Sequence, residues 1–343
     1  MPANLPPQYF EAEKAYRRAR SPAEKIEALE TMLAVMPKHK GTDHLRAELR
    51  ARIAALTEQA ERQAGAARAQ LYTVRREGAG QVALVGLPNA GKSQLLAVLT
   101  NATPKIADYP FTTQLPQPGM MPFENVQVQL VDLPPVVPGE TPGWQRALIR
   151  QADVLLLLVD LSEDPLSDWE TLQQELAAMR VLPVAPDRQA SADEDEEDAQ
   201  TPQEDRIPGA YRKKALLAGT KYDAPGAAEC YELLALEVGD RLPLFAISSA
   251  TGQGLEALRR ALFDALDVIR VYTKPPGRPA DRTRPFVLPR GSTIDDLADA
   301  IHHELREKLR YAVVWGESGK FSGQRVGRQH VLEDEDVVEL YER

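Results

Sequence analysis

The sequence predicts an α/β fold in which a mostly parallel, doubly wound sheet follows an N-terminal helical hairpin and precedes a small α+β unit. Three observations support this. Helical periodicity dominates residues 8–72, short apolar runs alternate with helical stretches from about residue 80, and a third pattern of strands and one helix begins near residue 270. Alternating strands and helices predict a parallel sheet whose ligand binds at the carboxyl ends of its strands.

The first segment contains two clear helical patterns. Ser21 can cap the first helix, with Pro22 at its first position and Glu24 closing a capping box. Thr42 can cap the second, after the break "PKHKGT". Apolar residues recur at helical spacing in both: Leu29, Met32, Leu33 and Met36, then Leu45, Leu49, Ile53 and Leu56. The pattern predicts an antiparallel hairpin, whose basic turn 38–40 either contacts an acidic partner or is simply solvated.

The central and C-terminal segments each have their own strands. Central strands are expected at 81–86, 126–132, 154–160, 214–220 and 242–248, with helices at 165–180, 226–238 and 252–267. In the C-terminal unit we expect strands at 268–273, 284–289, 310–316 and 336–342 and one amphipathic helix at 293–309. We find no internal repeat.

Composition indicates an ordinary globular protein of the cytoplasm. The net charge of −10 argues against wholesale nucleic-acid binding, although much of it lies in the acidic stretch 192–205. That stretch has no apolar periodicity, so 186–207 is expected to be a disordered insertion; a functional acidic segment is the alternative. A single cysteine, Cys230, excludes a disulfide framework and is expected to pack on a helix. The longest apolar run, 154–159, is too short to cross a membrane.

The strongest chemical signal is "GLPNAGKS", residues 86–93, between a predicted strand and helix. It fits the P-loop pattern, in which Gly86 and Gly91 permit a tight turn whose N–H groups surround phosphates. Lys92 would reach the β- and γ-phosphates, and Ser93 would ligate Mg²⁺. The nucleotide-binding residues expected here are Gly86, Pro88, Asn89, Ala90, Gly91, Lys92, Ser93 and Gln94.

Two further stretches supply metal ligands in the order of a GTPase. "DYPFTT" (108–113) offers Thr113, or alternatively Thr112, as the second Mg²⁺ ligand in a mobile loop. "VDLPP" supplies Asp132, which would hold the metal through a water. Lys92 and Thr113 are therefore the expected catalytic residues.

Two later stretches predict guanine recognition. "TKYD" (220–223) resembles N-K-x-D with Thr220 in place of asparagine; Asp223 would accept hydrogen bonds from guanine N1 and N2, and Lys221 would pack along the base. "SSATGQGL" (248–255) resembles the loop that closes over guanine, with Ser248, Ser249 and Ala250 as binding residues.

With these stretches in order, "KIADYPFTT" after the P-loop resembles the Obg/DRG family of translation-factor GTPases. The segments "VYTKPPG", "YAVVWG", "RVG" and "HVLEDEDVVEL" resemble its β-grasp-like TGS domain. The resemblance implies a helical hairpin at 1–75, a GTP-binding G domain at 76–268 and a TGS domain at 269–343. It also implies GTP hydrolysis and ribosome association, with rRNA or ribosomal protein contacted through the TGS domain and the hairpin.

The sequence departs from the family in the switch II segment that follows Asp132. This segment, "DLPPVVPGETPGW", is short and proline-rich, whereas the DRG-type insertion elsewhere in the G domain is absent and the acidic loop occupies roughly its place. Within switch II, Pro135 stands where the family has glycine. Proline has no N–H to give the γ-phosphate. Val136 is hydrophobic, as is normal for the family. Two hypotheses follow: a slow, Mg²⁺-dependent GTPase, or a GTP/GDP-binding scaffold with little hydrolysis. An ATPase fits less well because Asp223 suits guanine.

Two other features each allow two interpretations. Asn89 would ligate K⁺ beside the phosphates, as in potassium-using GTPases that this sequence resembles, or it simply forms the turn. In the C-terminal unit, cations either contact RNA phosphates or belong to a solvated mixed-charge surface. These cations are Lys274, Arg278, Arg282, Arg284, Arg290, Arg306, Lys308 and Arg310.

Overall fold

A computed structural model of the chain describes residues 6–19, 22–36, 44–56, 72–100, 115–186, 209–275, 280 and 282–342. It divides into two compact units, Met1–Thr73 and Val74–Arg343, which are considered separately. Several predicted features lie outside the described residues: the caps Ser21 and Thr42, the turn 38–40, the loop with Thr112 and Thr113, nearly all of the acidic insertion, and Arg278.

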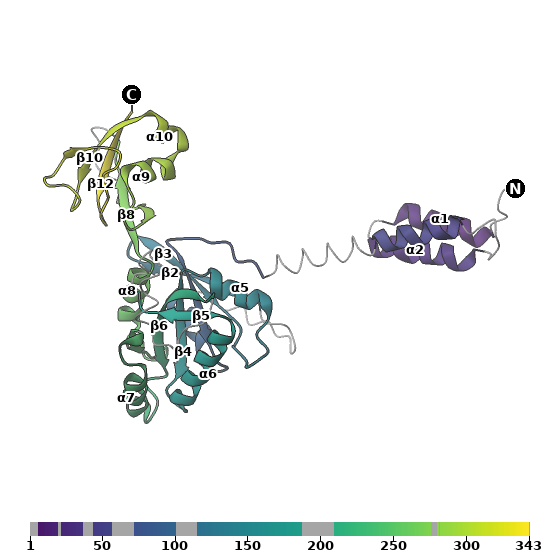
Figure 1. The fold of residues 1–343 in the computed structure, drawn as a ribbon, viewed down its shortest axis with the longest axis horizontal. Helices are drawn as coiled ribbons and strands as arrows, with labels where there is room; N and C mark the ends of the chain where they lie inside the picture. The colour runs from purple at the N-terminus through teal and green to yellow at the C-terminus, as the bar shows by residue number, and fades with distance from the viewer. Residues whose placement is uncertain are drawn as a thin grey trace. The chain divides into compact units, whose positions relative to one another are not determined.

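The N-terminal unit is helical, as its periodicity predicts. Helices α1 (Pro7–Arg18) and α2 (Pro22–Val35) lie side by side, and residues 44–56 are also helical (Figure 1). One apolar core joins all three, formed by Tyr9, Ala12, Leu29, Met32, Met36 and Leu49. Leu45, Ile53 and Leu56 pack against it, as the predicted spacing requires.

The second unit begins with a seven-stranded sheet. Six of its strands lie in the order β2-β3-β1-β4-β6-β5, and the seventh, β7, pairs with β6. The strands are β1 (Gln81–Gly86), β2 (Gln117–Phe123), β3 (Val126–Asp132), β4 (Val154–Asp160), β5 (Val181–Val184), β6 (Tyr211–Thr220) and β7 (Leu244–Ala246). All pairs are parallel except β2 with β3. The doubly wound G-domain fold predicted from the sequence is confirmed.

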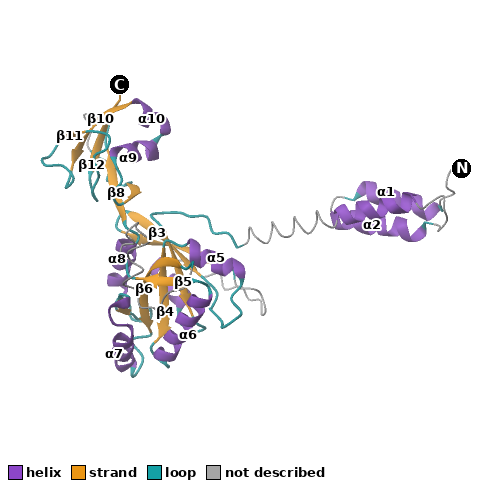
Figure 2. Cartoon of the chain, in the orientation of Figure 1, coloured by secondary structure: helices purple, strands orange, loops and turns teal. Residues whose placement is uncertain are grey.

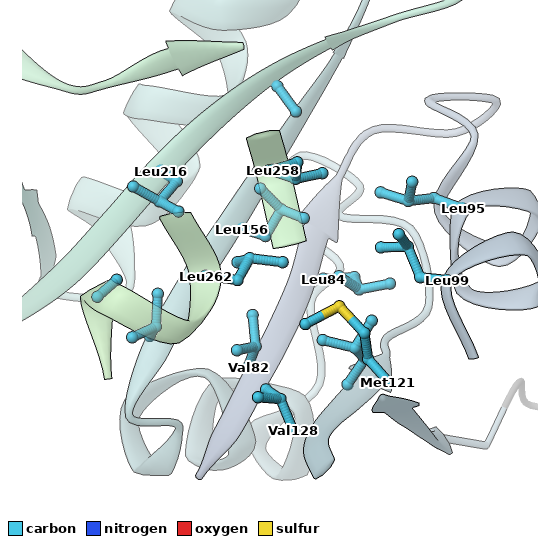
Figure 3. Close-up of a cluster of buried hydrophobic side chains, with 14 of the residues drawn as sticks. Val82, Leu84, Leu95, Leu99, Met121, Val128, Leu156, Leu216, Leu258 and Leu262 are labelled. Atoms are coloured by element: carbon cyan, nitrogen blue, oxygen red, sulfur yellow. The ribbon is translucent and has the colours of Figure 1, made fainter. Parts of the chain in front are cut away.

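Helices cover both faces of this sheet (Figure 2). They are α4 (Lys92–Thr100), α5 (Gly143–Gln151), α6 (Pro165–Ala178), α7 (Ala227–Val238) and α8 (Leu255–Ala265), with the short 3₁₀ helix η3 (Gly239–Arg241) after α7. Alternate strand residues face opposite cores. Figure 3 shows the core under α4 and α8, where Leu84 and Leu156 meet Leu95 and Leu262. The second core, under α5, α6 and α7, contains their sequence neighbours Val85 and Leu157.

The C-terminal part forms a five-stranded sheet in the order β11-β10-β12-β8-β9. Its elements are β8 (Val268–Thr273), β9 (Phe286–Pro289), α9 (Ile294–Ile301), α10 (His303–Lys308), β10 (Leu309–Trp315), β11 (Gln324–Val326) and β12 (Val337–Glu342). Helix α9 packs on one face through Ile294 and Leu297. The single helix expected at 293–309 is interrupted, because His302 has an extended backbone (φ −166°, ψ 131°) between α9 and α10.

Arg270 on β8 connects this sheet to the G domain. Its buried guanidinium is ion-paired to Asp334 at 2.7 Å and Glu335 at 3.2 Å, and to Glu124 at the turn between β2 and β3. It also lies over the ring of Phe263 on α8, with its central carbon 5.3 Å from the ring centroid. Among the described residues, no helix is long and apolar enough to span a membrane.

Candidate nucleotide-binding site

The P-loop is the turn between β1 and α4, and its two glycines have different reasons to be glycine. A Cβ on Gly86 would lie 2.7 Å from the carbonyl oxygen of Leu158, so β1 and β4 leave no room for a side chain. Gly91 has φ +80°, a left-handed conformation that glycine adopts without strain. Asn89 is also left-handed (φ 64°), which asparagine tolerates better than most residues. Pro88, Asn89 and Gln94 are exposed, whereas Ala90 is buried.

Lys92 is bent back over its own loop. Its Nζ donates to the carbonyl oxygens of Gly86 at 3.0 Å and Leu87 at 2.8 Å, and the residue is only 6% exposed. Burial lowers the pKa of Lys92 to about 8, although the nearby carboxylate of Asp132 opposes the shift. The ammonium is therefore a cation whose charge two carbonyls compensate only in part.

Ser93 and Asp132 form a close pair across the ends of β3 and α4. The Ser93 hydroxyl donates to Oδ2 of Asp132 at 2.5 Å, while Oδ1 is buried without a hydrogen-bond partner in the part of the chain that the structure describes. Burial raises the pKa of Asp132, with Ser93 and Lys92 acting in the opposite direction. A carboxylate with an unused oxygen beside a hydroxyl is a donor set that suits Mg²⁺.

The start of switch II is fixed to the P-loop strand. Leu133 and Val136 are buried, and the Val136 N–H donates to the carbonyl oxygen of Gly86 at 3.0 Å. The Gln145 amide on α5 donates to the carbonyl oxygen of Pro134 at 2.7 Å. Leu133 and Val136 thus belong to the core, Pro134 and Pro135 between them are partly buried, and the segment becomes exposed at residue 137.

The "TKYD" loop begins with a threonine that contacts the P-loop. Thr220 is buried at the end of β6, and its hydroxyl oxygen lies 3.2 Å from the carbonyl oxygens of both Ala90 and Val159. Lys221 follows with φ 55° and is ion-paired to Asp160, the last residue of β4. Asp223 is exposed, with no hydrogen bond or ion pair within the described ranges.

Asp160 is a buried carboxylate that belongs to none of the predicted motifs. Besides Lys221 it accepts hydrogen bonds from the N–H and the hydroxyl of Ser162, at 2.9 and 2.6 Å. Burial alone would raise the pKa of Asp160, but the bonds from Lys221 and Ser162 lower it overall. Its sequence signal is the same as that of Asp132: an acidic residue ending a buried apolar strand.

The "SSATGQGL" loop is joined to the "TKYD" loop through the backbone. The Tyr222 N–H donates to the carbonyl oxygen of Ile247 at 3.1 Å, and the buried Ser248 hydroxyl accepts the Thr251 N–H at 3.1 Å. Ser249 is half-buried and Ala250 exposed. The structure therefore brings 86–94, Asp132, 220–223 and 248–250 to one edge of the sheet.

Two parts of the chain match known protein families. Residues 81–185 match the family model described as 50S ribosome-binding GTPase, and residues 269–342 match the TGS domain. The chain is 30% identical over 362 residues to an uncharacterized GTP-binding protein of Methanocaldococcus jannaschii, with 92% of each chain covered. It is 29% identical to ribosome-interacting GTPase 1 of Saccharomyces cerevisiae (93% and 99% covered) and 28% identical to developmentally-regulated G-protein 3 of Arabidopsis thaliana (93% and 98%).

The chain belongs to the Obg/DRG family of GTPases. It is a GTPase with a TGS domain, and its relatives include a developmentally-regulated G-protein and a ribosome-interacting GTPase. Among solved structures, the G domain of the T. maritima FeoB iron transporter is 24% identical with a TM-score of 0.37, covering 54% of this chain and 98% of that chain. The assignment to the Obg/DRG family depends on the relatives and family models rather than on this likeness.

Proposed function

We propose that this Obg/DRG GTPase hydrolyses GTP slowly in a Mg²⁺-dependent reaction, and that its nucleotide state regulates docking on the ribosome. The observation that carries the proposal is the Ser93–Asp132 pair, held 2.5 Å apart beside the buried Lys92. Ser93 and Asp132 would hold Mg²⁺ together with Thr113, which lies outside the described residues. The metal, when bound, would neutralise charge on the β- and γ-phosphates.

Lys92 would exchange its two carbonyl contacts for the β- and γ-phosphates. The N–H groups of the loop from Gly86 to Ser93 would surround the same phosphates. Phosphate charge favours the protonated ammonium, so nucleotide would reverse the lowering of the Lys92 pKa that burial produces.

The base would lie between the two joined loops. Asp223, exposed and without a partner among the described residues, would accept hydrogen bonds from the N1–H and N2–H groups of guanine. Lys221, held by Asp160, would pack along the ring, and Ser248, Ser249 and Ala250 would close the other side. Adenine cannot supply the same pair of protons, so the arrangement favours guanine over adenine nucleotides.

A low rate follows from switch II. Pro134 and Pro135 have no N–H, and the Val136 N–H is already donated to Gly86. We therefore expect the γ-phosphate to be held by Lys92 and the Thr113 loop alone. Hydrolysis would be slow unless a partner positions the attacking water. The same observation favours the second candidate, a GTP/GDP-binding scaffold with little hydrolysis.

The proposed partner is the ribosome, contacted through rRNA or ribosomal protein by the TGS domain (269–343) and the helical hairpin (1–75), with the G domain (76–268) between them. Such a role implies a cytoplasmic protein. Asn89 is exposed and left-handed, which suits either a K⁺ ligand or a simple turn. Potassium stimulation distinguishes these two interpretations.

The test is single-turnover GTP hydrolysis with and without Mg²⁺, with and without ribosomes, in KCl and in NaCl. We expect hydrolysis that requires Mg²⁺ and is accelerated by ribosomes. Ser93→Ala should abolish it, whereas Ser167→Ala, an exposed serine on α6, should not. Nucleotide binding without hydrolysis under every condition would favour the scaffold, and hydrolysis unaffected by Ser93→Ala would refute the proposed metal site.

A further inference from the structure

Four of the seven predicted TGS-domain cations that the structure describes are engaged in ion pairs. The pairs are Lys274 with Glu339 at 2.8 Å, Arg290 with Asp267 at 3.0 Å, Arg306 with Asp299 at 3.8 Å and Lys308 with Glu304 at 3.3 Å. Arg282 lies over the ring of Tyr272. These residues therefore offer less free positive charge than their number suggests.

A different surface of the TGS domain combines aromatic rings with cations. On β10, β11 and β12 alternate residues belong to the core under α9, for example Ala312, Val326 and Leu340. Their neighbours lie on the opposite face of the sheet. Together with Lys274, which follows β8 and contacts Glu339 and Trp315, we call this set the aromatic face: Lys274, Tyr311, Trp315, Arg325, Glu339 and Tyr341.

The side chains of this face form two stacks across the strands. Tyr311 and Tyr341, directly opposite on β10 and β12, stack with centroids 4.7 Å apart and planes 13° apart. The central guanidinium carbon of Arg325 lies 3.7 Å from the Tyr311 ring centroid, so three planar groups from three strands follow one another. In the second stack, Nζ of Lys274 lies 3.8 Å from the centroid of Trp315.

The acidic charge on the aromatic face is compensated, whereas part of its basic charge is not. Glu339 is 3% exposed, and it is ion-paired with Lys274 and accepts a hydrogen bond from the Tyr341 hydroxyl, so its charge is already compensated. Arg325 is exposed and has no carboxylate partner within the described residues. The β10–β11 connection adds Lys320, exposed with no ion pair in the same set, and Phe321, which is 65% exposed.

We propose that the aromatic face, with Phe321 and Lys320, binds unpaired RNA. The outer plane of the Arg325 guanidinium and the exposed ring of Phe321 offer stacking surfaces for bases, and Arg325 and Lys320 supply charge for the phosphates. Bases in a duplex are stacked on each other and cannot reach such surfaces. The inference rests on the proposed ribosome association and names the chemistry that the TGS domain recognises.

Fluorescence anisotropy tests the proposal by measuring how the full-length protein binds a fluorescein-labelled, 12-nucleotide single-stranded RNA. A hairpin duplex of the same composition serves as the comparison. Arg325→Ala and Phe321→Ala should each weaken single-strand binding about tenfold. Arg325→Lys keeps the positive charge but lacks the planar guanidinium, so it should show most of the loss in single-strand affinity expected for Arg325→Ala. Lys308→Ala, on α10 and not on this face, removes one positive charge as a matched control and should change it less than twofold.

Preference for the duplex, or unchanged single-strand binding in both alanine variants, would overturn the inference. Ribosome co-sedimentation of the same proteins separates it from the function it rests on. If the parent co-sediments and Arg325→Ala does so equally well, the aromatic face is wrong but ribosome docking stands. If the parent itself does not co-sediment, the proposed function fails. Binding of GDP should be the same in all variants, which verifies their folding.

Discussion

Lys92 and Asp132 carry opposite charges, and both are buried in a site that disfavours their charged forms. Burial lowers the pKa of the lysine and raises that of the aspartate, so each is shifted toward its neutral form. Charged groups held in this way are typical of sites that are completed by a ligand. Nucleotide phosphates and a metal would supply the missing compensation.

The lysine gives a prediction about pH. Since the pKa of Lys92 is about 8 without nucleotide and phosphates would raise it, GDP binding should take up a proton above pH 8. Affinity should be full below pH 7 and fall about fourfold between pH 7 and pH 8.5. Calorimetry in buffers of different ionisation enthalpy measures both effects. Lys92→Arg should bind more weakly at every pH but without this decline; the same decline in that variant would assign it to another group.

Asp160 is predicted to position Lys221 rather than to contact nucleotide. Asp160→Asn keeps the shape but removes the charge that holds the lysine in its left-handed backbone conformation. We expect GDP and GTP to bind about three- to tenfold more weakly, less than the loss of a direct charge-assisted contact because Asp160 acts only through Lys221. Asp240→Asn, on the exposed η3, serves as the control. Equal affinities for both variants and the parent, by fluorescent-nucleotide titration, would show that Lys221 needs no such support.

At the scale of elements, switch II offers the clearest test. Pro135→Gly would restore an N–H next to the fixed Val136 and should raise the preference for GTP over GDP by about 1.5–3 kcal/mol. Because a ligand shifts a switch only by its differential affinity, protease sensitivity of 137–142 should also become more dependent on nucleotide. The comparison is Pro138→Gly, two residues beyond the buried Val136. A strong GTP preference in the parent, unchanged by the glycine, would mean that another group holds the γ-phosphate.

The strands that the sequence predicts best are rich in apolar residues, either in a continuous run, as in β1 and β4, or interrupted by single polar residues, as in β3 and β8. The bounds of β1, β3, β4 and β8 agree with the expected segments residue for residue. Strand β2 was missed because "QPGMMPF" contains two prolines, which its antiparallel edge position tolerates. Strands β5 and β11 are too short to show alternation. The break at His302 was missed because the apolar spacing continues through it.

The site was predictable where chemistry is local and not where it depends on strand order. The P-loop glycines, Lys92 and Ser93 follow from one contiguous pattern. The ion pair of Asp160 with Lys221 does not, because it requires β4 and β6 to be neighbours with Asp160 opposite Thr220. The bond from Val136 to Gly86 likewise depends on β3 lying beside β1. Neither pairing can be inferred from separations of 61 and 50 residues in the sequence.

In the whole molecule, Arg270 joins the TGS sheet to the β2–β3 turn. Arg270→Met should lower the free energy of unfolding by about 2–3 kcal/mol, below the usual cost of breaking a buried pair because the acidic partners are partly exposed. Glu124→Gln, at the exposed end of the network, should cost less than about 1 kcal/mol. Urea unfolding measures both. Equal, small effects would indicate that packing alone fixes the two parts.

The pH dependence of this junction has a definite sign. Burial raises the pKa of Asp334, but hydrogen bonds and charge from Arg270 lower it overall. A carboxyl with a depressed folded-state pKa contributes stability above its unfolded value of about 3.9, and this is lost as the pH falls further. The difference in stability between the parent and Arg270→Met should therefore shrink below about pH 4.

Thr220 contacts both the P-loop and the end of β4, so it links the loop proposed to bind the phosphates with the loop proposed to bind the base. Its hydroxyl lies 3.2 Å from the Ala90 carbonyl oxygen, so the phosphate loop and the base loop meet through one side chain. In the proposed binding mode, a nucleotide is then a bivalent ligand on a rigid template. Once the phosphates are bound, the base experiences a high effective concentration at its own loop. Guanosine and pyrophosphate added as separate molecules would make the same contacts but would each bind much more weakly than GDP, because neither raises the effective concentration of the other.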